Sequence, residues 1–225
     1  MDITIIGLGG IGSHLSPMIA RYASYSMKTE SPININLVDG DYYETKNMER
    51  QDFDDLGNKA EIKARELQQV FPRISFNAIP YFLDETTIPK IVKNGDIVFL
   101  AVDNHKSRKI LSDYAREKLS DVTIISGGNE LVDGNVQIYV RKGGEDITPA
   151  LTDYHPEIDD PIDKLPNEMS CEELMNSGPQ ILFTNAGAAL LMSWAFYNAL
   201  SDNYKYSEIY FDVQNMKVDS KIRAP

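Results

Sequence analysis

The chain has 225 residues, of which 42% are hydrophobic and 25% charged, and its formal net charge is −12. This length and composition are typical of a globular protein with one sizeable core. The excess of acidic residues argues against nucleic-acid binding, because a phosphate backbone requires a basic surface. It is compatible with a partner that presents a basic face, although a charge that only keeps the protein soluble is the more common explanation.

Alternating apolar runs and helical patterns fill the first part of the chain. We expect strands at residues 3–6, 33–38, 75–79, 97–102 and 122–126, and helices at residues 13–24, 59–71, 86–94 and 107–119. Because strands and helices alternate and the strands are continuously apolar, this order predicts an α/β fold of the Rossmann-like, doubly wound type. Its sheet should be mostly parallel and covered on both faces.

The character of the sequence changes after Gly134. Residues 135–141 alternate as an antiparallel strand does, and residues 143–177 predict a long acidic crossover loop. Residues 180–200 are expected to form a largely buried apolar helix, and residues 209–213 a last edge strand. We therefore expect one domain, residues 1–225, with a nucleotide-binding core (1–140), the loop (143–177) and a C-terminal helix and edge strand (178–225).

The small number of cysteine and histidine residues argues against disulfide bonds and metal sites. The one cysteine, Cys171, excludes an internal disulfide and a cysteine-rich zinc site, and His14, His105 and His155 have no metal-ligand spacing. We therefore expect no zinc and a reducing, cytoplasmic location. The first residues do not form a basic leader and no apolar run reaches the length of a membrane span, so no membrane association is expected.

A glycine-rich turn, Gly7-Leu8-Gly9-Gly10-Ile11-Gly12, stands between the first expected strand and the first expected helix. Glycine permits a tight turn there and lets a phosphate approach the backbone amides at the helix N-terminus. The turn predicts a nucleotide site, with a purely structural turn as the alternative. By itself it does not distinguish NAD, FAD, S-adenosylmethionine and ATP.

Polar residues follow in a segment without apolar periodicity: Asn47, Arg50 and Gln51, then Lys59 at the start of a helix. A lysine at a helix N-terminus opposes the helix dipole, so we expect a compensating anion. A triphosphate held between Lys59, Arg50 and the amides of the glycine turn would supply it. Lys63, one turn further on, is either a second phosphate contact or a solvated lysine.

Two aspartates come at the ends of expected strands. Asp39 ends the second strand, where it can accept the ribose hydroxyls or can simply be solvated. Asp103 follows the strand at residues 97–102, and a carboxylate beside phosphates is the expected Mg²⁺ ligand. Alternatively Asp103 or Asn104 caps the next helix, and the two interpretations are compatible. Arg108 lies four residues beyond Asn104.

In this order the motifs resemble the ThiF/MoeB/ubiquitin-activating superfamily. They are Gly-x-Gly-Gly-x-Gly, Asp-x-Asp at a strand end, Asn-x-x-Arg-Gln, a lysine at a helix start, and Asp-Asn-x-x-x-Arg after a buried strand. The resemblance is close over residues 1–140 and looser beyond them. It implies a Rossmann-like adenylation domain that uses Mg-ATP to activate the C-terminal carboxylate of a ubiquitin-like or sulfur-carrier protein with a Gly-Gly-type end, releasing pyrophosphate. It also implies a homodimer or heterodimer, which the apolar helix favours.

The resemblance assigns a role to individual positions. It implies that Gly9, Gly10 and Gly12 border the adenosine and phosphates, that Asp39 holds the ribose, that Asn47, Arg50, Gln51 and Lys59 contact the phosphates, and that Asp103, beside Asn104, binds Mg²⁺. Gly127, Gly128 and Asn129 would leave room for a thin diglycine tail. No protein base is needed, since the carboxylate nucleophile is already ionised, and the cations lower the barrier to its approach.

Three alternatives stay open. Cys171 lies where several members carry a cysteine that forms a thioester or persulfide-linked adduct, yet Glu172 and Glu173 should raise the pKa of its thiol. The chain could instead be an idle nucleotide-binding subunit of a heterodimer, which Arg50 and Lys59 argue against. An NAD-dependent oxidoreductase would explain the glycine turn but would leave Arg50 and Lys59 without a role.

Overall fold

The structure is a computed structural model that describes residues 2–27, 33–45, 47, 53–168 and 182–225. Three residues expected at the site, Arg50, Gln51 and Cys171, lie outside these ranges. None of the helices in the described ranges is long and apolar enough to cross a membrane.

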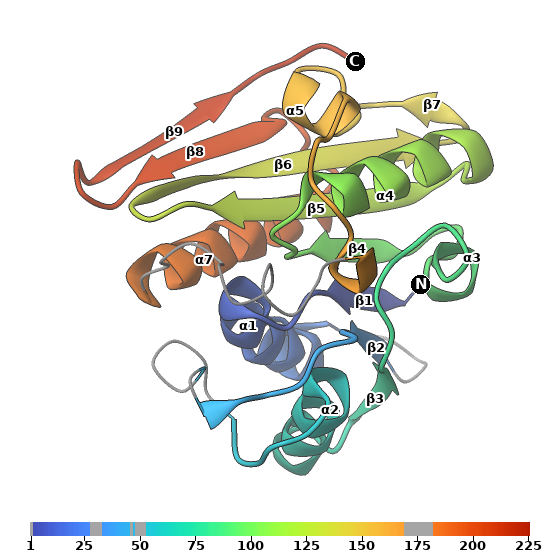
Figure 1. The fold of residues 1–225 in the computed structure, drawn as a ribbon. Helices are drawn as coiled ribbons and strands as arrows, with labels where there is room; N and C mark the ends of the chain where they lie inside the picture. Colours follow the sequence, from blue (N-terminus) through green and yellow to red (C-terminus); the bar gives the residue numbers. More distant parts are fainter. Residues whose placement is uncertain (1, 28–32, 46, 48–52, 169–181) are drawn as a thin grey trace.

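One sheet organises the described residues, with the strand order β3-β2-β1-β4-β5-β6-β8-β9 (Figure 1). The parallel strands are β1 (Ile3–Ile6), β2 (Ile33–Val38), β3 (Ile74–Ile79), β4 (Ile97–Leu100) and β5 (Val122–Asn129). The antiparallel strands are β6 (Asp133–Lys142), β8 (Glu208–Asp212), β9 (Lys217–Lys221) and β7 (Glu145–Asp146), which pairs only with β6. The order of the parallel strands is that of a doubly wound Rossmann-like sheet, so the predicted fold class is confirmed.

Helices cover both faces of this sheet. On one face the core contains side chains of α1 (Gly10–Ser26), α2 (Lys59–Val70) and α7 (Leu182–Ala199). On the other face it contains side chains of α3 (Ile88–Ile91), α4 (His105–Lys118) and α5 (Pro156–Asp159). The fully buried central strands β1 and β4 explain why their sequences are apolar without alternation.

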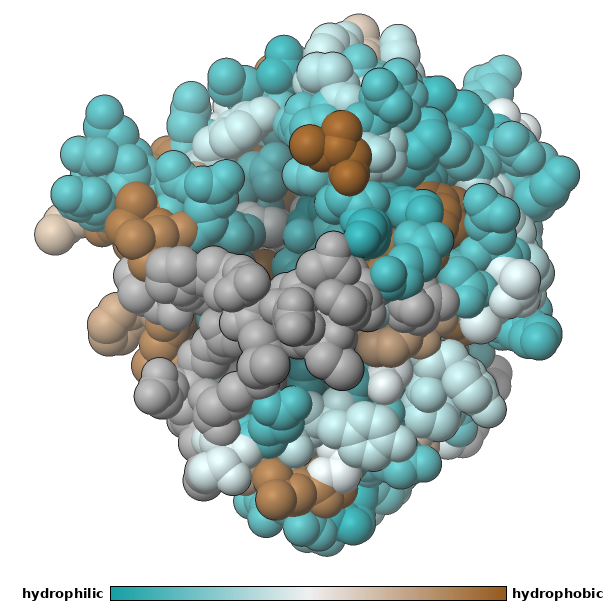
Figure 2. Space-filling view, viewed as in Figure 1, coloured by the Kyte–Doolittle hydropathy of each residue, from teal (hydrophilic) through white to brown (hydrophobic). Residues whose placement is uncertain are grey.

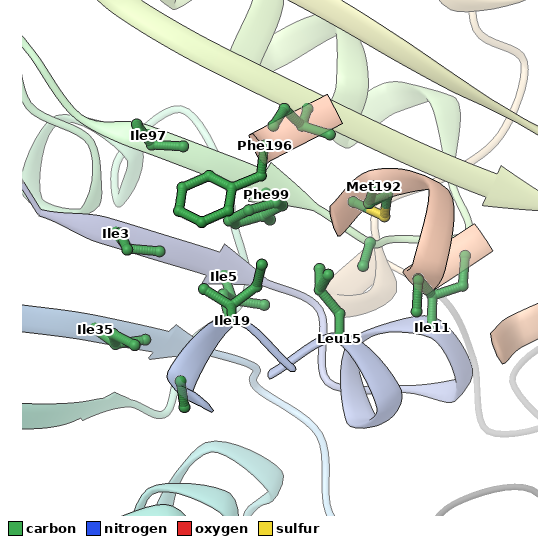
Figure 3. Close-up of a cluster of buried hydrophobic side chains, with 14 of the residues drawn as sticks. Ile3, Ile5, Ile11, Leu15, Ile19, Ile35, Ile97, Phe99, Met192 and Phe196 are labelled. Carbon is green, nitrogen blue, oxygen red and sulfur yellow. The ribbon is translucent and has the colours of Figure 1, made fainter. Parts of the chain in front are cut away.

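Aromatic and aliphatic side chains interlock where α1 and α7 cross the central strands (Figure 3). The rings of Phe99 on β4 and Phe196 on α7 meet edge to face, with centroids 5.4 Å apart. Leu15 of α1 and Met192 of α7 are fully buried beside them. This packing fixes α1, and with it the glycine turn at its N-terminus, against the carboxyl ends of the parallel strands.

The C-terminal region differs from the expectation in two ways. The helix α7 is buried on one side only, since Leu190, Trp194 and Tyr197 are 45%, 51% and 60% exposed. It is apolar around its whole circumference, but α1 and the sheet cover only part of it. The strand expected at residues 209–213 is present as β8, but it is not the edge strand, because β9 pairs outside it. The polar sequence of β9, Lys-Val-Asp-Ser-Lys, has no apolar signal.

The crossover segment begins with short elements, not with the irregular loop expected for residues 143–177. Up to residue 168 it contains β7, α5 and the 3₁₀ turn η2 (Pro166–Glu168). Asp163 accepts hydrogen bonds from the backbone N–H groups of His105 and Lys106, and Glu168 pairs with the Lys106 side chain. The segment is thereby held against the N-terminus of α4.

His155 joins the start of α5 to the C-terminal strands. Its Nδ1 lies 2.8 Å from Glu157 Oε1 and its Nε2 lies 2.8 Å from Glu208 Oε1. Glu208 also accepts hydrogen bonds from Tyr210 and Arg223. Burial alone would lower the pKa of His155, but its two carboxylate partners raise it above the ordinary value. Burial alone would raise the pKa of Glu208, but these hydrogen bonds lower it to about 2.

We expect His155→Gln to destabilise the protein by about 1–2 kcal/mol near pH 5.5, where wild-type His155 is charged. Because the folded-state pKa of His155 is raised, its contribution is present below the unfolded pKa and is lost as the pH rises through the folded value. The difference between wild type and variant in urea unfolding should therefore shrink at about pH 8.5. Glu157→Gln, at a half-exposed partner, should cost less. A difference that is equal at both pH values would contradict this account.

Candidate active site

A cleft runs along the carboxyl edge of the parallel strands and continues over the antiparallel strands. Its volume is about 1310 Å³, which exceeds the roughly 300–1,000 Å³ of a typical small-molecule site. Seven of the residues predicted to bind the nucleotide or Mg²⁺ line it: Gly9, Gly10, Asp39, Asn47, Lys59, Asp103 and Asn104. Gly128 and Asn129, predicted to leave room for a diglycine tail, line it too. The sheet thus brings together side chains that are widely separated in the sequence, at the edge where such folds bind ligands.

The glycines of the turn have different tasks. Gly7 has a φ of +89°, a conformation that favours glycine. A Cβ on Gly12 would lie 1.9 Å from the Gly7 carbonyl oxygen, so Gly12 is packed beneath the turn and does not line the cleft. A Cβ on Gly10 would overlap the Asn185 amide, whereas one on Gly9 would meet nothing within 4 Å. Gly7 also lines the cleft, so of the three glycines predicted to border the nucleotide, Gly9 and Gly10 do line it and Gly12 does not.

This contrast predicts opposite behaviour for two alanine substitutions. Gly12→Ala should lower the stability by about 2–3 kcal/mol, because backbone must move to admit the methyl group. Gly9→Ala should leave the melting temperature nearly unchanged, yet weaken nucleotide binding about tenfold, since its methyl group would stand where a phosphate approaches the amides. Thermal unfolding and calorimetry with ATP measure both effects. Loss of stability in Gly9→Ala, or its absence in Gly12→Ala, would refute this division of tasks.

Asp39 and Asn47 shape the wall beside the turn. The Asp39 carboxylate accepts the backbone N–H groups of Leu8, at 2.6 Å, and Asp41, at 2.8 Å. It is buried rather than solvated, and burial raises its pKa although the charge of a nearby lysine lowers it. Asn47 is also buried, and its Oδ1 accepts the Glu44 N–H. Asp39 therefore ties the glycine turn to the end of β2 while it lines the cleft.

Lys59 already has an anionic partner within the chain. Its Nζ lies 2.8 Å from Asp41 Oδ2, and the side chains of Lys59 and Asp41 are 9% and 52% exposed. This carboxylate offsets the unfavourable position of a lysine at the N-terminus of α2, which Asn58 caps. Lys63 is buried beside Glu66, at 2.5 Å, and does not line the cleft, so it is not the solvated lysine considered from the sequence.

Asp103 and Asn104 follow β4 at the centre of the cleft. Asp103 is exposed, and its carboxylate forms no hydrogen bond or ion pair with the residues that the structure describes. Asn104 caps α4, as its Oδ1 accepts the Ser107 N–H at 2.8 Å. Its Nδ2 is buried and has no hydrogen-bond partner. The cap expected from the sequence is present, and one amide donor beside Asp103 is left unused.

Arg108 is a part of the site whose role was not predicted from the sequence. Its guanidinium is buried and donates to Ser126 Oγ at 2.7 Å and to the carbonyl oxygens of Val102 and Gly127. Burial lowers its pKa to about 10, although three nearby carboxylates raise it in part, so Arg108 is charged at neutral pH. A Cβ on Gly128 would lie 2.6 Å from its Nη2. Arg108 thus joins the ends of β4 and β5 and places a positive charge at the wall of the cleft.

A divalent cation would find few protein ligands here. In the described ranges, no group of three or more histidine, cysteine, aspartate or glutamate side chains could hold a metal ion. The free carboxylate of Asp103 fits Mg²⁺, which commonly takes one or two carboxylates and completes its shell with substrate phosphates and water.

Fold and cleft together define a nucleotide-binding α/β protein of the Rossmann-like class. Residues 1–223 match the ThiF family, and the chain therefore belongs to the ThiF family. It is 24% identical over 218 residues to the SAMP-activating enzyme E1 of Haloferax volcanii, a match that covers 90% of this chain and 74% of that protein. It is 27% identical over 162 residues to the probable molybdopterin-synthase adenylyltransferase of Porphyra purpurea, covering 70% of this chain and 39% of that protein. Both relatives are named as activating or adenylylating enzymes.

Solved structures share the fold. E. coli MccB with AMPCPP and MccA superposes with a TM-score of 0.74 at 22% identity, covering 100% of this chain and 64% of that one. MccB with ATP superposes with a TM-score of 0.73 at 21% identity, covering 98% of this chain and 63% of that one. PaaA gives 0.71 at 16% identity, also covering 98% and 63%. The chain therefore spans less than two thirds of the length of these proteins.

Proposed function

We propose that this chain is an ATP- and magnesium-dependent adenylyltransferase, which activates the C-terminal carboxylate of a small ubiquitin-like or sulfur-carrier protein. One observation carries the proposal: a single cleft joins the glycine turn, Lys59 and Asp103 and then continues over the antiparallel strands. Its first part suits a nucleotide, and its continuation leaves room for a polypeptide end. The names of the relatives from Haloferax and Porphyra support the same substrate class.

The proposed nucleotide pose follows from the cleft wall. The amides of the turn at Gly9 and Gly10 would face the phosphates, and Asp39 the ribose. Asn47 and Lys59 would contact the phosphates, with Arg50 and Gln51 added from the sequence resemblance. Asp103 would hold Mg²⁺, which when bound neutralises phosphate charge.

The proposed reaction joins two anions. An oxygen of the substrate carboxylate forms a bond to the α-phosphorus, the bond from this phosphorus to the bridging oxygen breaks, and pyrophosphate leaves with the electron pair. The nucleophile is ionised, so the chain has only to position it and to supply positive charge. Lys59 can do so by exchanging Asp41, which is half exposed, for a phosphate oxygen. Arg108 adds a fixed positive charge at the wall of the cleft.

Two further parts of the proposal rest mainly on the sequence. In a second step after adenylation, the acyl group would be transferred to the Cys171 thiol and AMP would be released. We propose that both steps take place in a reducing, cytoplasmic compartment. A dimer is proposed through the exposed apolar side of α7, where Trp194 and Tyr197 lie. Tyr22 of α1 meets the Tyr197 ring edge to face and extends this surface.

Exchange of labelled pyrophosphate into ATP tests the proposal. We expect exchange only with Mg²⁺ and with a small protein whose C-terminus ends in Gly-Gly, and none when that terminus is amidated. Calorimetry should show binding of ATP and not of NAD. Protein that binds Mg-ATP but supports no exchange with any such carrier would contradict the enzymatic proposal and favour an idle subunit. Binding of NAD in preference to ATP would favour an oxidoreductase.

A further inference from the structure

The N-terminus of α1 has no capping side chain of its own. Its N-cap is Gly9, and its first turn contains no acidic residue. The first N–H groups of a helix have no partner within the helix, and the helix dipole favours an anion beside them. Gly9 and Gly10 line the cleft, so this positive helix end faces the part of the cleft to which we assign the nucleotide phosphates.

A buried amide lies against this helix end. Asn185, in the first turn of α7, is fully buried. A Cβ on Gly10 would lie 2.3 Å from Asn185 Nδ2 and 2.8 Å from its Oδ1, so the amide contacts the first residue of α1. Neither amide atom has a hydrogen-bond partner among the residues that the structure describes. Asn185 is thus an unpaired polar group beside a helix end that lacks a cap.

This position is unfavourable for an amide. Figure 2 shows hydrophilic residues over much of the visible surface, where water can pair their polar atoms, whereas Asn185 has no contact with solvent. The core side chains contributed by the same two helices, such as Ile11, Leu15 and Met192, are apolar (Figure 3). Buried polar atoms are nearly always paired in native proteins, and an unpaired one costs free energy. A leucine, which has nearly the same shape, would fill the position without that cost.

The start of α7 is held in place by the neighbours of Asn185. Thr184 Oγ1 donates to the Leu131 carbonyl oxygen at 2.8 Å, and Ala188, one turn further on, is fully buried in the core. Because the helix is fixed on both sides of Asn185, its amide stays beside Gly10. It is therefore available to a ligand that brings a hydrogen-bond acceptor to the turn.

We propose that Asn185 is a further phosphate-binding residue of the nucleotide site, in which its Nδ2 donates a hydrogen bond to a phosphate oxygen held at the N-terminus of α1. The inference rests on the nucleotide-binding part of the proposed function. A phosphate oxygen is an acceptor that the helix end already attracts, and the amide adds a donor to it. Asn185 does not line the cleft but Gly10 does, so a rotation of the amide past the bare Cα of Gly10 brings Nδ2 to the phosphate.

The substitution Asn185→Leu tests the inference, because stability and binding should respond in opposite ways. The melting temperature of the free protein should equal that of the wild type or exceed it by about 2–4 °C, since the unpaired amide is removed. The dissociation constant for Mg-ATP should rise about tenfold, whereas that for adenosine, which has no phosphate, should change by less than about twofold. Calorimetry measures the binding of ATP, and competition with a fluorescent ATP analogue measures that of adenosine.

Two further variants separate hydrogen bonding from shape. Asn185→Ala removes the amide without adding bulk and should also weaken the binding of ATP about tenfold. Thr184→Val is the matched control, because it replaces a fully buried polar side chain in the same turn by an apolar one of the same shape. It removes a hydrogen bond that is present, so it should lower the melting temperature and leave the ATP affinity within about twofold of the wild type.

An ATP affinity within about twofold of the wild type in either Asn185 variant would overturn the inference. So would an equal loss of affinity for ATP and adenosine, or a marked fall in the melting temperature of Asn185→Leu, since either would indicate a structural role. Wild-type protein that binds no Mg-ATP would contradict the proposed function and this inference together. Pyrophosphate exchange by the wild type judges the adenylation reaction separately, so the inference can fail while the proposed function stands.

Discussion

Replacing Asp103 by alanine is expected to lower pyrophosphate exchange by about 10²–10³-fold, because it removes the free carboxylate that we propose holds Mg²⁺. The free energy of unfolding should change by less than about 0.5 kcal/mol, since Asp103 is exposed and its carboxylate, although near enough to Arg108 to raise the pKa of that residue, forms no hydrogen bond or ion pair with the described residues. Exchange assays at several Mg²⁺ concentrations, together with urea unfolding, measure both quantities.

Asp113→Ala provides the control for Asp103. Asp113 lies on α4, the helix that follows Asp103, pairs only loosely with Lys109 at 3.4 Å, and does not line the cleft. Its exchange rate should equal that of the wild type. Full exchange in Asp103→Ala would show that the magnesium assignment is wrong, although the proposed adenylation chemistry would survive that result.

Replacing Lys59 by methionine should reduce exchange by about 10²-fold, because the charge that faces the phosphates is lost while the aliphatic stem is kept. The fold should tolerate the change. Asp41 is left without its partner, but it is half exposed and remains near the N-terminus of α2, where a carboxylate is favourable.

The variant Asp41→Asn distinguishes the contribution of Asp41 to the reaction from that of Lys59. It keeps Lys59 and removes only the carboxylate that pairs with it, so exchange should change by less than about tenfold. Equal losses in Lys59→Met and Asp41→Asn would indicate that the ion pair itself, and not the availability of Lys59 to a phosphate, is what the reaction needs.

The parallel half of the fold could be predicted from the sequence with good accuracy. Apolar residues correctly placed β1 and β2 at residues 3–6 and 33–38. The strand β1 is buried throughout, whereas in β2 buried isoleucines alternate with the partly buried Asn34 and Asn36. The antiparallel half was less accessible. The strand β5 continues through Gly127 and Gly128 to Asn129, and β9 is polar and fully exposed, so pairing with neighbours and not residue preference makes these segments strands.

The site, like the fold, could be predicted only in part from the sequence. The spacing of the motifs identified seven residues that do line the cleft, while the tasks of Gly12, Asp39 and Lys63 depend on contacts that no local pattern reveals. Arg108 is the clearest case of a residue that the sequence singled out without a function. Its partners come from the ends of two other strand segments, and only their meeting makes it a buried cation at the cleft wall.

The segment from Asp39 to Lys59 and the residues after β4 were enough, in sequence alone, to indicate a nucleotide-handling α/β protein of the ThiF family. These signals are local: a turn that requires glycine, a charged residue at a helix start and polar residues at strand ends. Only the tertiary structure decided that Lys59 is held by Asp41, that Arg108 lies against Gly128, and that the cleft continues over the antiparallel strands. Distances between residues far apart in the chain depend on how the strands are ordered and paired, and a linear pattern does not encode those distances in any one segment.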